Sequence, residues 1–132
     1  MSHILVVSSD GRSLTNTLGV LNKAGYEVSG ASTFEEAKQQ LATVPPDLVI
    51  ADERLGEFNG LHVILRARCK CPTVAGIVTT PSKSLGLEAD ALRLNVQCLT
   101  VRDDPSELLL SVSRTLTDPS IHALSPGAVR VA

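Results

Sequence analysis

The stretch Asp47-Leu48-Val49-Ile50-Ala51-Asp52, followed by Glu53-Arg54-Leu55-Gly56, decides the fold. Its apolar run is preceded by Pro45-Pro46 and ends in a loop that contains glycine, a pattern typical of a buried parallel strand. Asp52 then stands at the carboxyl end of a central strand, where open α/β sheets place their sites. An acid buried there costs free energy unless it finds a partner or takes part in chemistry. Asp52 is therefore the first candidate functional residue.

Strands and helices alternate along the rest of the chain. Apolar runs predict strands at residues 4–7, 27–31, 48–51, 74–78 and 98–101, and helical spacing of apolar residues predicts helices between them, including 60–68, 85–94 and 105–116. This alternation predicts an α/β fold with helices on both faces of a parallel sheet. We expect a doubly wound, five-stranded sheet in the flavodoxin-like order 2-1-3-4-5.

Length and composition limit the kinds of protein to which this chain can belong. The 132 residues suit one domain, which we place at residues 1–117, with a tail or linker at 118–132. A net charge of −2 without a basic block argues against a nucleic-acid surface. The chain has no apolar run near membrane-spanning length and no signal-peptide pattern, and its three cysteines suit a reducing compartment. These features predict a cytoplasmic protein without membrane contact.

The predicted strand order brings polar residues from distant positions to one edge of the sheet. The first and third strands are neighbours in this order, so the loops that carry Ser8, Ser9, Asp10 and Asp52 should meet. Loops after the fourth and fifth strands add three further candidates: Thr79, Thr80 and Arg102.

The run from Pro46 to Asp52, followed by Asn59-Gly60-Leu61, resembles the receiver domain of two-component response regulators, and residues 91–102 resemble the same family's passage from helix to fifth strand. The resemblance implies a (βα)5 fold and a role in phosphorelay signal transduction, with no enzymatic turnover. It also implies that Asp52 is the phosphoacceptor and that a histidine kinase or another signalling protein is the partner. In that family Mg²⁺ held by an acidic pair, a lysine, and a threonine or serine support the transfer, which depends on positioning and electrostatics.

The chain departs from the family pattern at these supports. The acidic pair corresponds to Ser8 and Ser9, with Asp10 close by, and the lysine corresponds to Arg102. Thr79 or Thr80 fills the hydroxyl position, and Leu99 replaces the aromatic switch residue. Hydroxyls are poor substitutes for carboxylates around Mg²⁺, so we expect weak or absent metal binding and no other cofactor. The departures predict an atypical or pseudo-receiver in which Arg102 either neutralises Asp52 in a salt bridge or contacts a phosphate, and with no metal present we expect the salt bridge.

Two other functions stay open on the sequence alone. One is a working phosphoacceptor with an unusual site. The other is a flavodoxin-type protein that binds flavin or another phosphate ligand at the loop Ser8-Ser9-Asp10-Gly11, although the chain has few aromatic residues to stack on a flavin ring. For a receiver, we expect the output surface at residues 85–94, 98–101 and 105–116, where the family often dimerises, and we predict a homodimer or a partner contact there.

Overall fold

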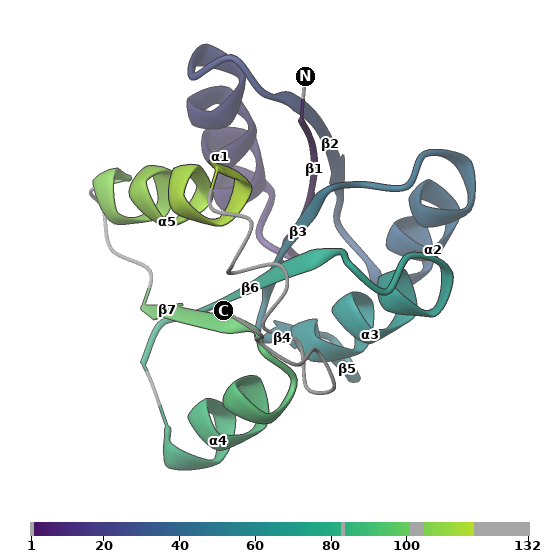
Figure 1. Ribbon diagram of the computed structural model, residues 1–132, viewed down its shortest axis with the longest axis vertical. Helices are drawn as coiled ribbons and strands as arrows, with labels where there is room; N and C mark the ends of the chain where they lie inside the picture. Colours follow the sequence, from purple (N-terminus) through teal and green to yellow (C-terminus); the bar gives the residue numbers. More distant parts are fainter. Residues whose placement is uncertain (1, 83, 101–104, 118–132) are drawn as a thin grey trace, which may run out of the picture.

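The computed structural model describes residues 2–82, 84–100 and 105–117, which form a five-stranded parallel sheet flanked by helices (Figure 1). The sheet order is β2-β1-β3-β6-β7, so the predicted 2-1-3-4-5 arrangement is confirmed. The sheet strands are β1 His3–Val7, β2 Glu27–Ala31, β3 Leu48–Asp52, β6 Ala75–Thr80 and β7 Gln97–Thr100. The helices are α1 Gly11–Lys23, α2 Phe34–Thr43, α3 Gly60–Lys70, α4 Leu85–Arg93 and α5 Ser106–Thr117.

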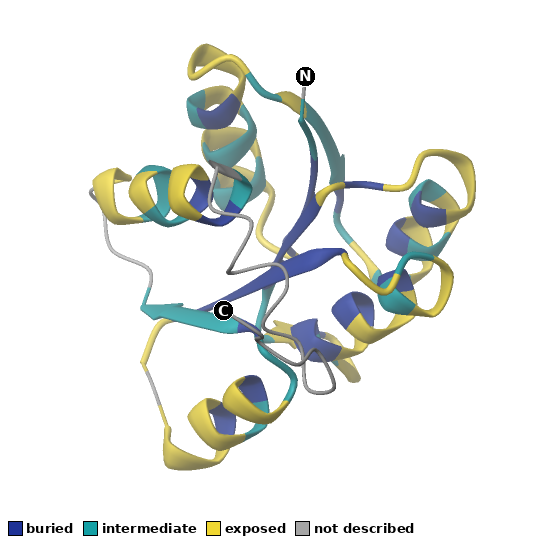
Figure 2. Cartoon of the chain, viewed as in Figure 1, coloured by how far each residue is buried: buried dark blue, intermediate teal, exposed yellow. Residues whose placement is uncertain are grey.

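Alternate residues of the central strands build two hydrophobic clusters on opposite faces of the sheet. Leu5, Val49 and Val78 face α2, α3 and α4, whereas Ile4, Ile50 and Ile77 face α1 and α5. Figure 2 shows β3 and β6 as almost continuously buried, while β7 at the sheet edge is only half-buried. Because both faces of the central strands are covered, these strands read in the sequence as unbroken apolar runs.

The helices begin at side chains that accept backbone N–H groups, as helix starts in general require. Asp10, Thr33, Asn59 and Ser84 cap α1, α2, α3 and α4 respectively. Gly25 follows α1 with a φ of +99°, a left-handed conformation that glycine adopts without strain. The capping residues thereby set where each helix leaves the sheet.

The segment after Asp52, predicted only as a loop, forms a small antiparallel hairpin. Its strands are β4 Arg54–Leu55 and β5 Phe58–Asn59, with Gly56 between them at a φ of +65°. The Phe58 ring stacks on Phe34 of α2 at a centroid distance of 4.2 Å. This contact between segments distant in sequence explains why local patterning did not predict the hairpin.

Two predicted segments, the last strand and the tail, extend beyond the residues that the structure describes. The last strand begins one residue before the predicted start, at Gln97, and residue 101 lies outside the described part of the chain. The predicted tail at 118–132 also lies outside it. Within the part of the chain that the structure describes, no helix has the length and hydropathy needed to cross a bilayer.

Candidate functional site

Strand alternation carries three side chains of the candidate site to the same place. Asp52 pairs with Thr79 in the β3–β6 register, and Ala51 pairs with Val7, so that Ser8 emerges beside Asp52. Successive strand residues point to opposite faces, which puts Ser8, Asp52 and Thr79 on the face covered by α1 and α5. The structure thus brings together residues that lie far apart in the sequence.

Both carboxylate oxygens of Asp52 accept a hydrogen bond from a protein hydroxyl. Ser8 Oγ donates to Oδ2 at 2.5 Å, and Thr79 Oγ1 donates to Oδ1 at 2.8 Å. Ser8 is 2% exposed and Thr79 is 8% exposed, whereas Asp52 is half-buried. Because each donor is buried and each bond has an ionised acceptor, these hydrogen bonds belong to the stronger class.

No hydrogen bond among the described residues joins Asp52 to the other two residues proposed for the acidic-pair positions, Ser9 and Asp10. The Asp10 carboxylate caps α1 and accepts the N–H groups of Arg12 and Ser13 at 3.0 and 3.4 Å. Ser9 is exposed. A carboxylate at a helix N-terminus is stabilised by the free N–H groups and the helix dipole, so the Asp10 carboxylate is engaged at the start of α1.

Thr79 and Thr80 were both candidates for the hydroxyl position, and the structure separates them. Thr79 bonds Asp52, whereas Thr80 points to the opposite face and donates to Glu53 Oε1 at 2.8 Å. Glu53 was not singled out from the sequence. The only sequence signal for it is its position directly after Asp52, which does not show that its carboxylate would meet a threonine from β6.

The two remaining candidates differ in what can be said of them. Arg102 lies outside the described residues, so the proposed Asp52–Arg102 pair stays a prediction. Leu99 is half-buried on β7 and packs against the cluster beneath α1 and α5. A cleft of about 720 Å³ opens on this face, with Asp52, Thr79 and Leu99 among its lining residues.

Gly60 fixes the distance between the start of α3 and the strand end. A Cβ at this position would lie 2.3 Å from the carbonyl oxygen of Asp52, closer than real contacts allow. The Gly60 N–H also donates to the carbonyl oxygen of Glu53 at 3.0 Å. A side chain at residue 60 would therefore displace the backbone that carries the candidate phosphoacceptor.

Among the described residues, no positively charged side chain forms an ion pair with Asp52. The two ion pairs found in that part of the chain, Glu35–Lys38 and Asp90–Arg93, are on helices and exposed. Over the same residues, no group of three or more histidine, cysteine or acidic side chains could hold a metal ion. Burial lowers the pKa of Arg68, and the Ser32 N–H and hydroxyl lower the pKa of Glu36.

Comparison with known proteins indicates which family shares this fold and its strand-end aspartate. No family model matches the chain. Over 114 residues, 86% of the chain, it is 30% identical to the alginate biosynthesis transcriptional regulatory protein AlgB of Pseudomonas aeruginosa, and it spans 25% of that protein. The chain thus spans about a quarter of the length of the first curated relatives it matches.

Two solved structures resemble the fold over nearly the whole chain. The signal receiver domain of an HD domain-containing protein from Pseudomonas fluorescens has a TM-score of 0.80 and 27% identity, covering 92% of this chain and 97% of that one. A CheY-like response regulator receiver domain protein from Methanospirillum hungatei has a TM-score of 0.82 and 24% identity, covering 91% and 97%. Fold, strand-end aspartate and relatives agree, and the chain belongs to the receiver-domain family of response regulators, the signalling modules of two-component systems.

Proposed function

We propose that this chain is an atypical receiver that signals through protein–protein contacts and does not depend on metal-assisted phosphorylation of Asp52. The observation that carries the proposal is the Ser8–Asp52 hydrogen bond of 2.5 Å. At a position where the family places an acid that holds the metal, this chain has a hydroxyl that donates to the phosphoacceptor itself. The protein thereby satisfies internally a carboxylate that an ordinary receiver leaves open to a metal ion and a phosphoryl group.

The donor set around Asp52 does not fit Mg²⁺. This ion prefers several oxygen ligands, with carboxylates among them, in a near-octahedral shell. Ser8 is engaged as a donor to Asp52, and Asp10 is engaged at the N-terminus of α1. Glu53 receives the Thr80 hydroxyl. Among the described acids, Asp10 and Glu53 are thus engaged away from Asp52 by their side chains, so we expect weak or absent binding.

The rival interpretation as a phosphate-ligand or flavin binder finds no support at the loop after β1. A phosphate would need the free N–H groups at the start of α1. The Asp10 carboxylate accepts two of them, from Arg12 and Ser13, and its negative charge repels an anion.

The output surface is best sought on α4 and α5. Leu85 and Leu92 on α4 are 86% and 81% exposed, and Leu110 on α5 is 52% exposed. Large apolar side chains at such exposure favour a partner surface when they gather on neighbouring elements. We propose a second copy of this chain or a signalling protein such as a histidine kinase as the partner, bound without catalytic turnover.

Intact-mass measurement after treatment with acetyl phosphate and Mg²⁺ tests the proposal. We expect no phosphoryl adduct on the natural chain. A double variant, Ser8→Asp with Ser9→Asp, restores acids at the pair positions, and we expect it to gain stability on addition of Mg²⁺ where the natural chain does not. An adduct mapped to Asp52 of the natural chain would instead support the working phosphoacceptor.

Sedimentation velocity over a concentration series tests the proposed contact. A dimer of this size of domain is expected to bury roughly 1,200–2,000 Å² in total. Leu92→Glu should weaken it, whereas Leu65→Glu, on α3 and 41% exposed, should not. A monomer at every concentration, together with unchanged partner capture by Leu92→Glu, would contradict this part of the proposal.

A further inference from the structure

Thr80 makes a buried polar connection that the phosphoacceptor site does not use. It is 1% exposed and lies on the face of the sheet covered by α2, α3 and α4, opposite to Asp52. Its hydroxyl is 2.8 Å from Glu53 Oε1 and 2.8 Å from the carbonyl oxygen of Ser82, and it accepts the Ser82 N–H at 3.3 Å. A hydroxyl has a single proton to donate, and an ionised carboxylate is the stronger acceptor. The hydroxyl therefore bonds Glu53 while it holds the backbone of Ser82.

Glu53 makes three hydrogen bonds, two to β6 and one to α3. Its N–H donates to the carbonyl oxygen of Thr79 at 2.8 Å, which extends the β3–β6 pairing by one residue. Its carbonyl oxygen accepts the Gly60 N–H at 3.0 Å, at the start of α3. Its carboxylate accepts the Thr80 hydroxyl. Since its backbone is fixed at both ends, the Glu53 side chain is a firm anchor for whatever Thr80 holds.

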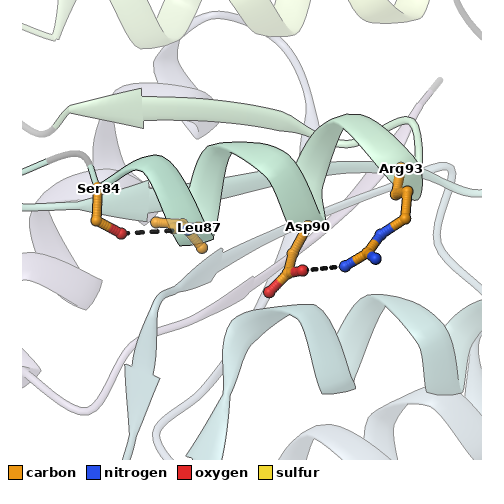
Figure 3. A network of polar contacts seen from close by, with 4 residues as sticks. All are labelled: Ser84, Leu87, Asp90 and Arg93. Atoms are coloured by element: carbon orange, nitrogen blue, oxygen red, sulfur yellow. Dashed lines mark hydrogen bonds and ion pairs between the residues drawn. The ribbon is translucent and has the colours of Figure 1, made fainter.

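Thr80 leads directly toward α4. Ser84 caps this helix by accepting the Leu87 N–H at 3.2 Å on its side chain (Figure 3). Its carbonyl oxygen accepts the Glu88 N–H at 3.0 Å. The other polar contact drawn in Figure 3, Asp90 with Arg93, is exposed and joins two residues of α4 to each other. It does not tie the helix to the sheet. Ser84 follows Thr80, the last residue of β6, by four positions, so the cap of α4 is close in sequence to the Thr80 hydroxyl.

We propose that the Thr80–Glu53 hydrogen bond is a latch that couples the end of β3 to the start of α4, with Glu53 as the positioning residue. The proposal rests on the proposed function, because it explains how an output helix is held in one place by a receiver whose Asp52 is already satisfied. The two consecutive threonines have different partners: Thr79 donates a hydrogen bond to Asp52, and Thr80 donates one to Glu53 at the start of the connection to α4. Coupling then runs through Glu53 and does not require a phosphoryl group.

Amide hydrogen exchange at the start of α4, measured without acetyl phosphate or Mg²⁺, tests the latch. Thr80→Val keeps the shape and β-branching of threonine but removes the hydroxyl, and Glu53→Ala removes the acceptor. Loss of a hydrogen bond to a charged group corresponds to roughly a tenfold change in a local opening equilibrium. We expect exchange of the Leu87 and Glu88 amides to accelerate by about that factor in each variant, and by no further factor in the double variant.

Conservative variants and a matched control make the result specific. Thr80→Ser retains the hydroxyl and Glu53→Gln retains an oxygen acceptor, so both should protect α4 better than Thr80→Val and Glu53→Ala. Glu36→Ala removes a hydroxyl–carboxylate bond of the same kind, Ser32 to Glu36 at 2.9 Å on α2, and should leave α4 unchanged.

Two outcomes would overturn the latch. One is exchange at Leu87 within about twofold of the natural chain in both Thr80→Val and Glu53→Ala, well short of the loss expected for a charged bond. The other is equal acceleration in β1, which would indicate general loss of stability. Either result could occur while Asp52 still fails to accept a phosphoryl group, so failure of the latch is distinguishable from failure of the proposed function.

Discussion

Removing the Ser8 hydroxyl should destabilise the domain through Asp52. In Ser8→Ala the Asp52 Oδ2 atom loses a donor at 2.5 Å, while the Thr79 bond to Oδ1 stays. A hydrogen bond to a charged group contributes about 1.5–3 kcal/mol when buried. Because Asp52 is only half-buried, water replaces part of the lost bond, and we expect the free energy of unfolding to fall by about 1–2 kcal/mol.

Urea unfolding followed by far-ultraviolet circular dichroism is the suitable assay, because the chain has no tryptophan. Ser9→Ala is the matched control: it is the same substitution one residue away, at an exposed side chain, and should change stability by less than about 0.5 kcal/mol. A double-mutant cycle of Ser8→Ala with Asp52→Ala should return a coupling energy of about 1–2 kcal/mol. Equal stabilities of the Ser8 and Ser9 variants, with no coupling to Asp52, would refute the reasoning that the carboxylate is satisfied internally.

Three further predictions concern positions around the site and at the helix ends. Gly60→Ala should cost about 1–3 kcal/mol in urea unfolding, because its Cβ would lie 2.3 Å from the Asp52 carbonyl oxygen and the backbone must shift. Arg68→Met should cost about 2–3 kcal/mol in the same assay, because the half-buried guanidinium donates to three backbone carbonyl oxygens that methionine leaves unpaired. The pKa of Glu36 is lowered by the Ser32 N–H and hydroxyl, so its contribution to stability is present above the ordinary glutamate pKa and is lost as the pH falls through the lowered value. Measured against pH, Glu36→Gln should therefore lose less stability on acidification than the natural chain; parallel pH profiles would contradict this.

The sheet and its order could be predicted from the sequence because both faces of β1, β3 and β6 are buried. A strand that is buried on both faces has a nearly continuous run of apolar residues, which can be recognised in the sequence. Short connections between the elements leave few topologies to consider. The position of Asp52 at a strand end followed from the same run. The hairpin after Asp52 has no comparable apolar run, because its strands have two residues each. It is supported by the stacking of Phe58 on Phe34 of α2.

The partners of the site residues could not be predicted for a related reason. Which of Thr79 and Thr80 meets Asp52 depends on the register of β6 against β3, and a shift by one residue exchanges the two faces. The engagement of Asp10 at α1 had a recognisable signal, an acid placed directly before a helix, but only coordinates show that its carboxylate accepts the N–H groups of Arg12 and Ser13. The Glu53–Thr80 contact had no local signal at all.

The pair of hydroxyls on Asp52 also changes what an external ligand must overcome. Ser8 and Thr79 are competitors attached to the same molecule, and their effective concentration at the carboxylate is set by the fold, not by diffusion. A metal ion or phosphoryl donor in solution competes against two bonds that re-form whenever it departs. Raising the ligand concentration favours the ligand but leaves both internal hydrogen bonds in place. A substitution at Ser8 removes one of these two bonds. Under the proposed function, the strength of the Ser8 and Thr79 hydrogen bonds to Asp52 is therefore what such a ligand must exceed.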